Sequence, residues 1–420
     1  MKPMLATSAM ISAILLISAC NLPQELPDTS SLPTLAAPTQ TALPVDNPQA
    51  SPAPADCPIP PDPGAALAIE ASANPVQDVL DFLNAGGSTA DARVALRNWN
   101  NSSPEDIALA QVDVNGDGFL DLFAVVRINA DIPLESRVFS LTCANARYQL
   151  EYISPALYGN RPADIYAVAD FTGNGLEDVL TIQESCGAHT CSLQPTLLTW
   201  TGGRLSDRWL ESTADIPSPV IEILSSGESL PIVRITGTSI QSAGAGPLRP
   251  FQRDFGWDAA AQAITLLQET TLPATYRIHV LLDAEEAYLR SEFELALQGY
   301  QRVIEDDSLD DWIYGNEGYS RLSAYALFRS MLLHLQRGEN SQGEAAFLVL
   351  REGYPSGGGR MFAEMGQAFW ESFSSSNSLE AGCLAARAYA ELHAVEILDA
   401  LSYGYANPAY TVSDICPIIP

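Results

Sequence analysis

The sequence predicts an α+β protein of several domains, in which repeated β units precede an all-helical region. Short runs rich in β-branched and aromatic residues fill positions 105–270, and such runs are typical of strands. From about residue 276 onward the apolar residues recur at helical spacing instead. With 420 residues, the chain has room for two or three domains after a leader and a linker.

The first twenty residues have the pattern of an export signal. Lys2 precedes an apolar run that is too short for a permanent membrane span and that ends in Ile-Ser-Ala-Cys at positions 17–20. This tetrapeptide resembles the lipobox of bacterial lipoproteins. The resemblance implies that residues 1–19 are a signal peptide and that Cys20 is lipidated, which would anchor the chain to a membrane outside the cytoplasm. An ordinary signal peptide with a coincidental cysteine is the alternative.

Residues 20–64 are expected to form a disordered tether. Twelve prolines stand between positions 21 and 64, and such a segment buries too little apolar area to offset its ordering entropy. At about 3.1 Å per residue it could hold the folded part up to ~120 Å from its anchor. A short helical cap over 65–104 should follow, with helices over 75–84 and 90–99.

The β-rich region contains landmarks that recur at an interval of 57 residues. Asp113 and Asp170 are separated by this interval, and so are Trp200 and Trp257. One interval before Trp200 stands Cys143 in a similar context. Since the landmarks are different, the sequence predicts three related units.

Two of the three units carry a loop of oxygen-bearing side chains. In the first loop, over 113–121, three side chains stand at every second residue and the fourth stands four residues further on; they are three carboxylates and one amide. Two glycines within the loop favour a turn. Convergent hard oxygen donors suit Ca²⁺. The second copy, over 170–178, holds fewer carboxylates, and the third unit has lost the loop, with glycine at position 227.

The motif Asp-x-Asn-x-Asp-Gly-x-x-Asp over 113–121 resembles the FG-GAP/VCBS repeat family, whose units are blades of a β-propeller. Because a closed propeller has four to eight blades, about three units imply a partial or divergent β-propeller-like domain, or a ring completed by another chain. The resemblance implies one or two Ca²⁺ sites. It implies first-site ligands at Asp113, Asn115, Asp117, Phe119 (through its carbonyl) and Asp121. The implied second, weaker site comprises Asp170, Thr172, Asn174, Leu176 and Asp178.

Residues 113–121 have two other interpretations. An EF-hand needs glutamate at position 12, where this chain has Ala124, and a following helix, where it has the strand-like run 122–128. The EF-hand is therefore rejected. A hairpin closed by Asx turns, without an ion, remains the structural alternative.

The C-terminal region, 276–420, is expected to be helical. Ser291, Ala296 and Tyr300 share their spacing with a second set at 338, 343 and 347. This pattern is similar to the tetratricopeptide repeat (TPR), with an insertion around 306–316, and implies stacked helical hairpins that present a concave surface to peptides. A generic α-hairpin bundle is the alternative. The expected helices cover 279–290, 292–305, 317–337, 341–353, 360–374 and 377–402.

Six cysteines remain after Cys20, and an even number outside the cytoplasm favours disulfides. Arithmetic alone allows fifteen pairings. We expect Cys186–Cys191 across a tight loop, Cys383–Cys416 within the C-terminal region, and Cys57–Cys143 by elimination. Cys186, His189 and Cys191 could alternatively ligate zinc or supply a nucleophile, although no fourth zinc donor is evident.

Charge and motifs restrict the function. The chain has 51 acidic and 21 basic residues, a net charge of −30, which argues against nucleic-acid binding. No familiar catalytic motif is present, so no catalytic residue is assigned. The expectation is a lipid-anchored, noncatalytic module for binding or scaffolding an unknown protein or envelope glycan. An extracytoplasmic hydrolase or enzyme accessory subunit, and a purely structural envelope component, are the alternatives.

Overall fold

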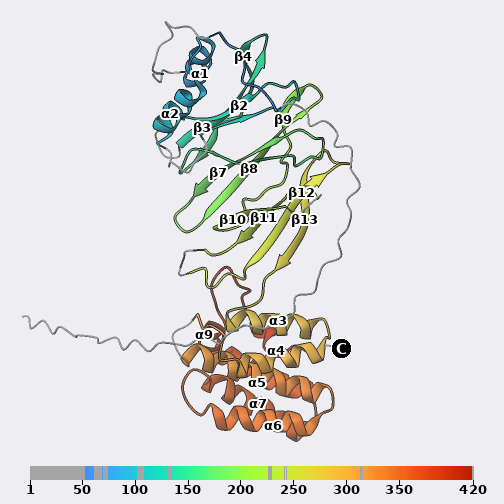
Figure 1. Cartoon of the computed structure of the whole chain (residues 1–420). Helices are drawn as coiled ribbons and strands as arrows, with labels where there is room; N and C mark the ends of the chain where they lie inside the picture. Colours follow the sequence, from blue (N-terminus) through green and yellow to red (C-terminus); the bar gives the residue numbers. More distant parts are fainter. Residues whose placement is uncertain are drawn as a thin grey trace, which may run out of the picture. The chain divides into compact units, whose positions relative to one another are not determined.

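The computed structural model describes residues 53–60, 69, 74–101, 108–129, 134–225, 229–240, 242, 244–312 and 316–418. These form an α+β arrangement of three antiparallel sheets followed by helical hairpins (Figure 1). The expected signal peptide, Cys20 and most of the tether lie outside the described residues, as does position 227.

Two helices precede the sheets, as expected for the cap. They are α1 (Pro75–Asn84), which has proline in its first turn, and α2 (Thr89–Asn100), whose N-cap Ser88 accepts a hydrogen bond from the Asp91 amide. Their apolar faces bury Val79, Leu83 and Leu96 in one cluster with residues of the first sheet. Asn84 also exchanges two hydrogen bonds with the Tyr148 backbone, so the cap packs on the β region.

Each sheet is a meander, in which strands adjacent in sequence pair with one another. The first sheet contains β1 (Leu109–Val112), β2 (Asp121–Asn129), β3 (Leu134–Ala144) and β4 (Arg147–Ile153), with β5 (Leu157–Gly159) added against β3. The second contains β6 (Asp164–Ala169), β7 (Asp178–Cys186), β8 (Cys191–Thr201) and β9 (Arg204–Asp207). The third contains β10 (Val220–Leu224), β11 (Ile232–Gly237), β12 (Phe251–Asp258) and β13 (Ala263–Thr271).

The three landmarks at intervals of 57 residues occupy the same place in the three sheets. Cys143, Trp200 and Trp257 all lie near the end of the third strand of their meander, opposite the start of the fourth. Buried apolar side chains of the first and second sheets form one cluster, and those of the second and third form another. The predicted three units are therefore three sheets packed in series, and they do not close into a barrel.

The remaining helices form successive hairpins and lie close to the predicted bounds. They are α3 (Arg277–Leu289), α4 (Phe293–Glu305), α5 (Asn316–Gln336), α6 (Asn340–Gly353), α7 (Arg360–Ser376), α8 (Leu379–Leu392) and α9 (Ala394–Ala400). The prediction of a single helix over 377–402 is wrong. It breaks at His393, where φ is −120° and ψ is 33°, outside the helical region.

The turns and the acidic loop of the helical region are held by specific contacts. Ser291 and Gly338, at the two hairpin turns, both adopt positive φ, and the equivalent aromatics Tyr300 and Phe347 are buried. In the acidic loop that follows α4, over 306–311, the Asp311 carboxylate pairs with the buried Arg277 guanidinium at 3.1 Å. Among the helices of the described ranges, none has both the length and the apolarity to cross a membrane.

Candidate functional site

The first candidate calcium loop connects β1 to β2 and is organised by Asp113. Its Oδ1 accepts hydrogen bonds from the Gly116 and Asp117 amides at 2.8 and 3.1 Å, and its Oδ2 accepts one from Gly118 at 2.9 Å. Gly116 and Gly118 have φ of 75° and 87°, a region that glycine enters without steric cost. The glycines let the loop wrap around one carboxylate.

The other side chains of this loop also face backbone amides. Asn115 Oδ1 accepts from the Asp117 amide at 2.9 Å, and Asp117 Oδ1 accepts from the Phe119 amide at the same distance. Asp121 is fully buried at the start of β2. Its two oxygens accept from Val114 N at 3.3 Å and from Cys143 N at 3.0 Å.

The second loop, between β6 and β7, repeats this plan. Asp170 accepts hydrogen bonds from the amides of Gly173, Asn174 and Gly175, and Asn174 accepts from Leu176. The Thr172 hydroxyl lies 3.5 Å from Asp170 Oδ1. The two loops therefore share geometry as well as spacing.

The second buried aspartate differs from the first in one respect. Asp178 Oδ2 accepts from the Phe171 and Thr172 amides at 2.9 and 3.1 Å. Its Oδ1 is buried and has no donor in hydrogen-bonding geometry, although the Thr199 hydroxyl is close enough to lower the pKa of Asp178 somewhat. A buried carboxylate oxygen without a hydrogen-bond donor needs an explanation, and coordination of a cation is one explanation that fits.

Burial makes the negative charge of Asp121 and of Asp178 unfavourable, because the hydrogen bonds they accept do not offset the loss of water. Desolvation raises the pKa of Asp121 to about 7, with the amide of Cys143 opposing the shift and the carboxylates of Asp117 and Asp113 adding to it. Desolvation likewise raises the pKa of Asp178 to about 6, with Asp170 contributing. A divalent cation in either loop would offset this negative charge.

The donor set fits Ca²⁺ in kind, since each loop supplies carboxylate and amide or hydroxyl oxygens. The carboxylates of a loop nevertheless do not yet meet at one point. Within the described ranges, the only group of three Asp, Glu, His or Cys donors with ligand atoms within 4.8 Å of one another is Glu184, Cys186 and Cys191. Binding of Ca²⁺ would require Asp113 and Asp117 to turn from backbone amides toward a common centre.

The first loop is fastened to residues 53–60, which lie inside the segment expected to be a disordered tether, 20–64. The Ala55 amide donates to Gly118 O at 3.0 Å, and the Leu120 amide donates to Ala55 O at 2.8 Å. Two residues later, Cys57 is joined to Cys143 of β3 by a disulfide. Both connections hold residues 53–60 against the first sheet.

Neighbouring loops also touch one another. A Cβ placed on Gly116 would lie 2.9 Å from Leu176 Cδ2 of the second loop. A Cβ on Gly173, the equivalent glycine of the second loop, would lie 3.1 Å from Leu230 Cδ2, ahead of β11. Each of these loop glycines therefore accommodates a leucine from the next unit.

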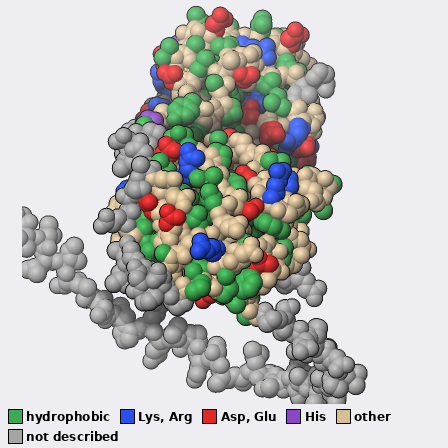
Figure 2. Space-filling view, turned by 90° about the horizontal axis from the view of Figure 1, so that it is seen from above, with side chains coloured by type: hydrophobic (Ala, Val, Ile, Leu, Met, Phe, Trp, Pro, Cys, Tyr) green, Lys and Arg blue, Asp and Glu red, His purple; other side chains and the backbone are tan. Residues whose placement is uncertain are grey.

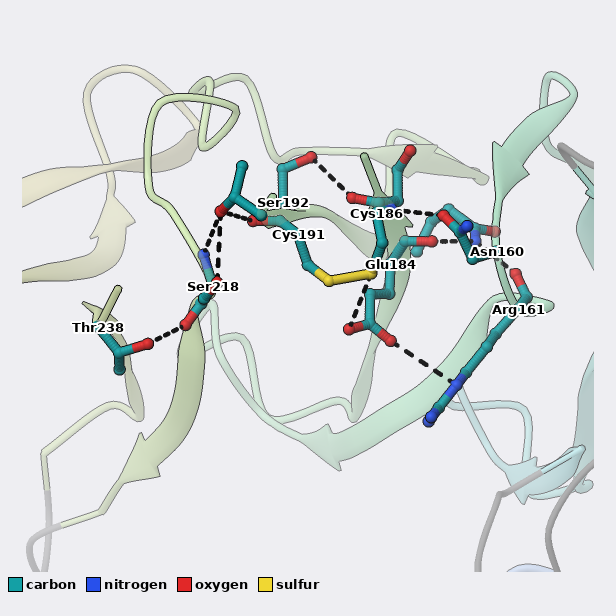
Figure 3. The surroundings of a disulfide bond; sticks show 11 residues. Asn160, Arg161, Glu184, Cys186, Cys191, Ser192, Ser218 and Thr238 are labelled. Carbon is teal, nitrogen blue, oxygen red and sulfur yellow. Dashed lines mark hydrogen bonds and ion pairs between the residues drawn. A yellow bond between two sulfur atoms is a disulfide. The ribbon is translucent and has the colours of Figure 1, made fainter. Parts of the chain in front are cut away.

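The six described cysteines form the three disulfides that the sequence favoured: Cys57–Cys143, Cys186–Cys191 and Cys383–Cys416. Cys186 and Cys191 are directly paired across the β7–β8 hairpin (Figure 3). Three disulfides indicate an oxidising, extracytoplasmic environment. His189 lies exposed in the turn of this hairpin.

Positive charge is dispersed over the surface. On the face drawn in Figure 2, basic side chains occur in small separate groups among acidic and apolar ones. Many of the described arginines pair with carboxylates, as Arg253 does with Asp215 and Glu269. This face therefore presents no continuous basic patch for a nucleic-acid backbone.

Sequence reasoning missed two carboxylates. Glu184 lies beside the Cys186–Cys191 disulfide. The one feature of the sequence that could have indicated this is the position of Glu184 two residues before Cys186 in a strand, which places both side chains on one face. Asp207 lines a cavity of about 350 Å³ together with Glu211 and the exposed Tyr158. Desolvation of its carboxylate in this cavity raises the pKa of Asp207, although the residue as a whole is exposed and the amides of Trp209 and Leu197 oppose the shift. Neither residue belongs to a recognisable motif.

Comparison with models of known protein families gives no match to this chain, and comparison with curated protein sequences gives none either.

Proposed function

We propose that the protein is an extracytoplasmic, lipid-anchored, noncatalytic module that binds or scaffolds a protein or an envelope glycan. In this proposal Cys20 carries the lipid, the proline-rich segment is the tether, and Ca²⁺ in the two loops stabilises a partial β-propeller. The disulfides are compatible with a location outside the cytoplasm, and the three sheets in series are compatible with a partial propeller.

The observation that carries the proposal is the attachment of residues 53–60. These residues lie near the C-terminal end of the expected tether, 20–64, and two backbone hydrogen bonds and a disulfide join them to the first loop and its sheet. A tethered module transmits any pull from its anchor to the point where the tether joins the fold. A covalent link there and a cation-stabilised loop beside it suit that role.

The helical hairpins α3–α4 and α5–α6 supply the second half of the proposal. Their equivalent buried aromatics and close helix crossings resemble TPR hairpins, which present concave surfaces to peptides. We therefore assign partner binding to the helical region and stabilisation by Ca²⁺ to the loops of the sheets.

Thermal melting tests the calcium part. Wild-type protein should melt at a higher temperature with Ca²⁺ than with EGTA, because a ligand that binds only the folded state stabilises it. Asp117→Asn should reduce this difference. Asp258→Asn is the matched control, since Asp258 is a turn aspartate that also accepts two backbone amides, from Ala260 and Ala261, in the third sheet. Equal calcium responses in both variants would remove the metal from the proposal.

Binding and anchoring need their own tests. Radiolabelled fatty acid should be incorporated into the wild-type chain and not into Cys20→Ala. The folded protein should co-sediment with isolated envelopes, and prior protease treatment of those envelopes separates a protein partner from a glycan. Absence of sedimentation with both preparations would contradict the binding role and leave the structural envelope component.

A hydrolase is the second candidate, and the cavity that contains Asp207 and Glu211 is the observation that favours it. Most glycoside hydrolases use two carboxyl groups in one cleft, of which the general acid has a raised pKa. The pKa of Asp207 is raised. A screen of glycan substrates should show turnover that Asp207→Asn abolishes if this alternative holds.

A further inference from the structure

The end of the β7–β8 hairpin brings three metal-ligating side chains together. Glu184 and Cys186 lie two positions apart on β7 and therefore share a face of the sheet, and Cys191 is the direct partner of Cys186 on β8. Glu184 Oε1 lies 3.6 Å from Cys186 Sγ. Figure 3 shows the Glu184 carboxylate beside the disulfide, directed also toward Arg161.

Of the three described disulfides, Cys186–Cys191 is the one in which both cysteines are partly exposed. By contrast, each of the other two has at least one buried cysteine. Cys57 is partly exposed but Cys143 is 4% exposed, and Cys383 and Cys416 are 1% and 0% exposed. Reduction requires direct attack on a sulfur atom, so a thiol reductant should open Cys186–Cys191 first.

We propose that reduction of Cys186–Cys191 creates a binding site for a thiophilic divalent cation of the Zn²⁺ class, with Cys186, Cys191 and Glu184 as its protein ligands. A dithiol reductant breaks the S–S bond by thiol–disulfide exchange. The reductant is oxidised to a cyclic disulfide, and its two thiol protons end on Cys186 and Cys191. On metal binding, both thiol protons leave to solvent and two metal–sulfur bonds form. Water occupies the fourth position of the tetrahedron, as in other sites with three protein ligands.

The position of Glu184 supports a cation specifically. A carboxylate 3.6 Å from sulfur opposes formation of a thiolate, because like charges repel. A divalent cation reverses the sign of this interaction and turns the carboxylate into a ligand. Arg161 would compete with the cation for the Glu184 carboxylate. This ion pair is weak, since Arg161 Nε lies 3.9 Å from Glu184 Oε2 and the Arg161 side chain is 80% exposed.

The donor types select the metal. Two thiolates and one carboxylate favour zinc and similar ions over Ca²⁺, which prefers oxygen donors. The site is therefore distinct from the two calcium loops, and it exists only in the reduced protein. Its failure would leave the proposed binding role untouched.

Cobalt titration of the full-length chain tests the proposal, because Co²⁺ bound to thiolate has a charge-transfer absorption band. The reduced wild type should bind one equivalent of Co²⁺ with this band and exchange it for Zn²⁺, and the oxidised protein should show no band. Glu184→Gln should weaken binding at least ~10-fold, the lower end of the loss seen when the surroundings of a metal site are altered.

Two further variants make the result unambiguous. Cys186→Ser/Cys191→Ser should lose the band while the other cysteines remain, and Glu344→Gln, at an exposed carboxylate of α6, should bind as wild type does. Circular dichroism checks that each variant is folded. A reduced wild type without a thiolate band, a band that survives in the double variant, or an unchanged affinity in Glu184→Gln would each overturn the proposal.

Discussion

The backbone amide of Cys143 donates a hydrogen bond to the buried Asp121 at 3.0 Å, and the side chain of the same cysteine is joined to Cys57. Cys143 of β3 therefore contacts Asp121, the last acid of the first loop, and holds residues 53–60 near the C-terminal end of the expected tether. Loop, disulfide and tether end form a single structural unit. A change in any one of them should alter the stability of the others.

Removal of the disulfide should loosen the first loop. Cys57→Ser/Cys143→Ser releases a covalent link across 86 residues, and loss of a native disulfide typically lowers the free energy of unfolding by about 2–5 kcal/mol. The Leu120 amide, which donates to Ala55 O, should exchange its hydrogen faster. Cys383→Ser/Cys416→Ser is the control and should leave Leu120 exchange unchanged.

A methyl group on Gly116 should cost more stability than one on Gly118. Both glycines have positive φ, so alanine introduces strain of about 1–2 kcal/mol at either position. Only at Gly116 does the new Cβ also meet Leu176, at 2.9 Å, whereas a Cβ built on Gly118 has no neighbouring atom within 4 Å. Urea denaturation should show the difference, and Leu176→Ala should reduce it. Equal losses in the two alanine variants would show that the loops do not support one another.

The stability contribution of Asp207 should fall as pH rises. Desolvation of the carboxylate raises the pKa of Asp207 above its ordinary value even though the residue keeps an exposed surface, so the folded chain holds this proton more tightly than the unfolded chain. The contribution is complete below about pH 4 and is lost as pH rises through the folded-state pKa. The difference in free energy of unfolding between wild type and Asp207→Asn should therefore decrease from about pH 4 upward. Parallel pH curves for the two proteins would contradict this.

The ion pair between Arg329 and Glu285 should be essential to the helical region. Arg329 is wholly buried, its Nε lies 2.7 Å from Glu285 Oε1, and its guanidinium packs over Tyr288. Arg329→Met leaves the Glu285 carboxylate without its cation, with the Tyr300 hydroxyl still donating to it, and should cost about 3–5 kcal/mol. Arg360→Met, which removes an exposed pair with Glu364, should cost less than about 1 kcal/mol. Denaturant unfolding of the two variants checks the contrast.

Much of the fold could be predicted because it depends on residues close in sequence. Proline in the first turn of α1 and the Asp-Asn-Gly chemistry of the loops express local preferences of the backbone. The interval of 57 residues is visible because each unit repeats such a local pattern. The break at His393 could not be predicted in this way, because the surrounding residues keep an apolar pattern that suits a continuous helix. Its neighbours Leu392 and Val395 are instead exposed, at 82% and 71%.

Residue order alone indicates the succession of parts in an acidic chain: a proline-rich segment, three β units with two acid loops, and helical hairpins. The folded chain adds that Glu184 lies against a disulfide, that Arg329 meets Glu285, and that Cys57 reaches Cys143 beside the first loop. The physical reason is distance along the chain. Local patterns follow from the preferences of neighbouring residues, whereas most of these contacts exist only after remote segments have packed together and excluded water between them.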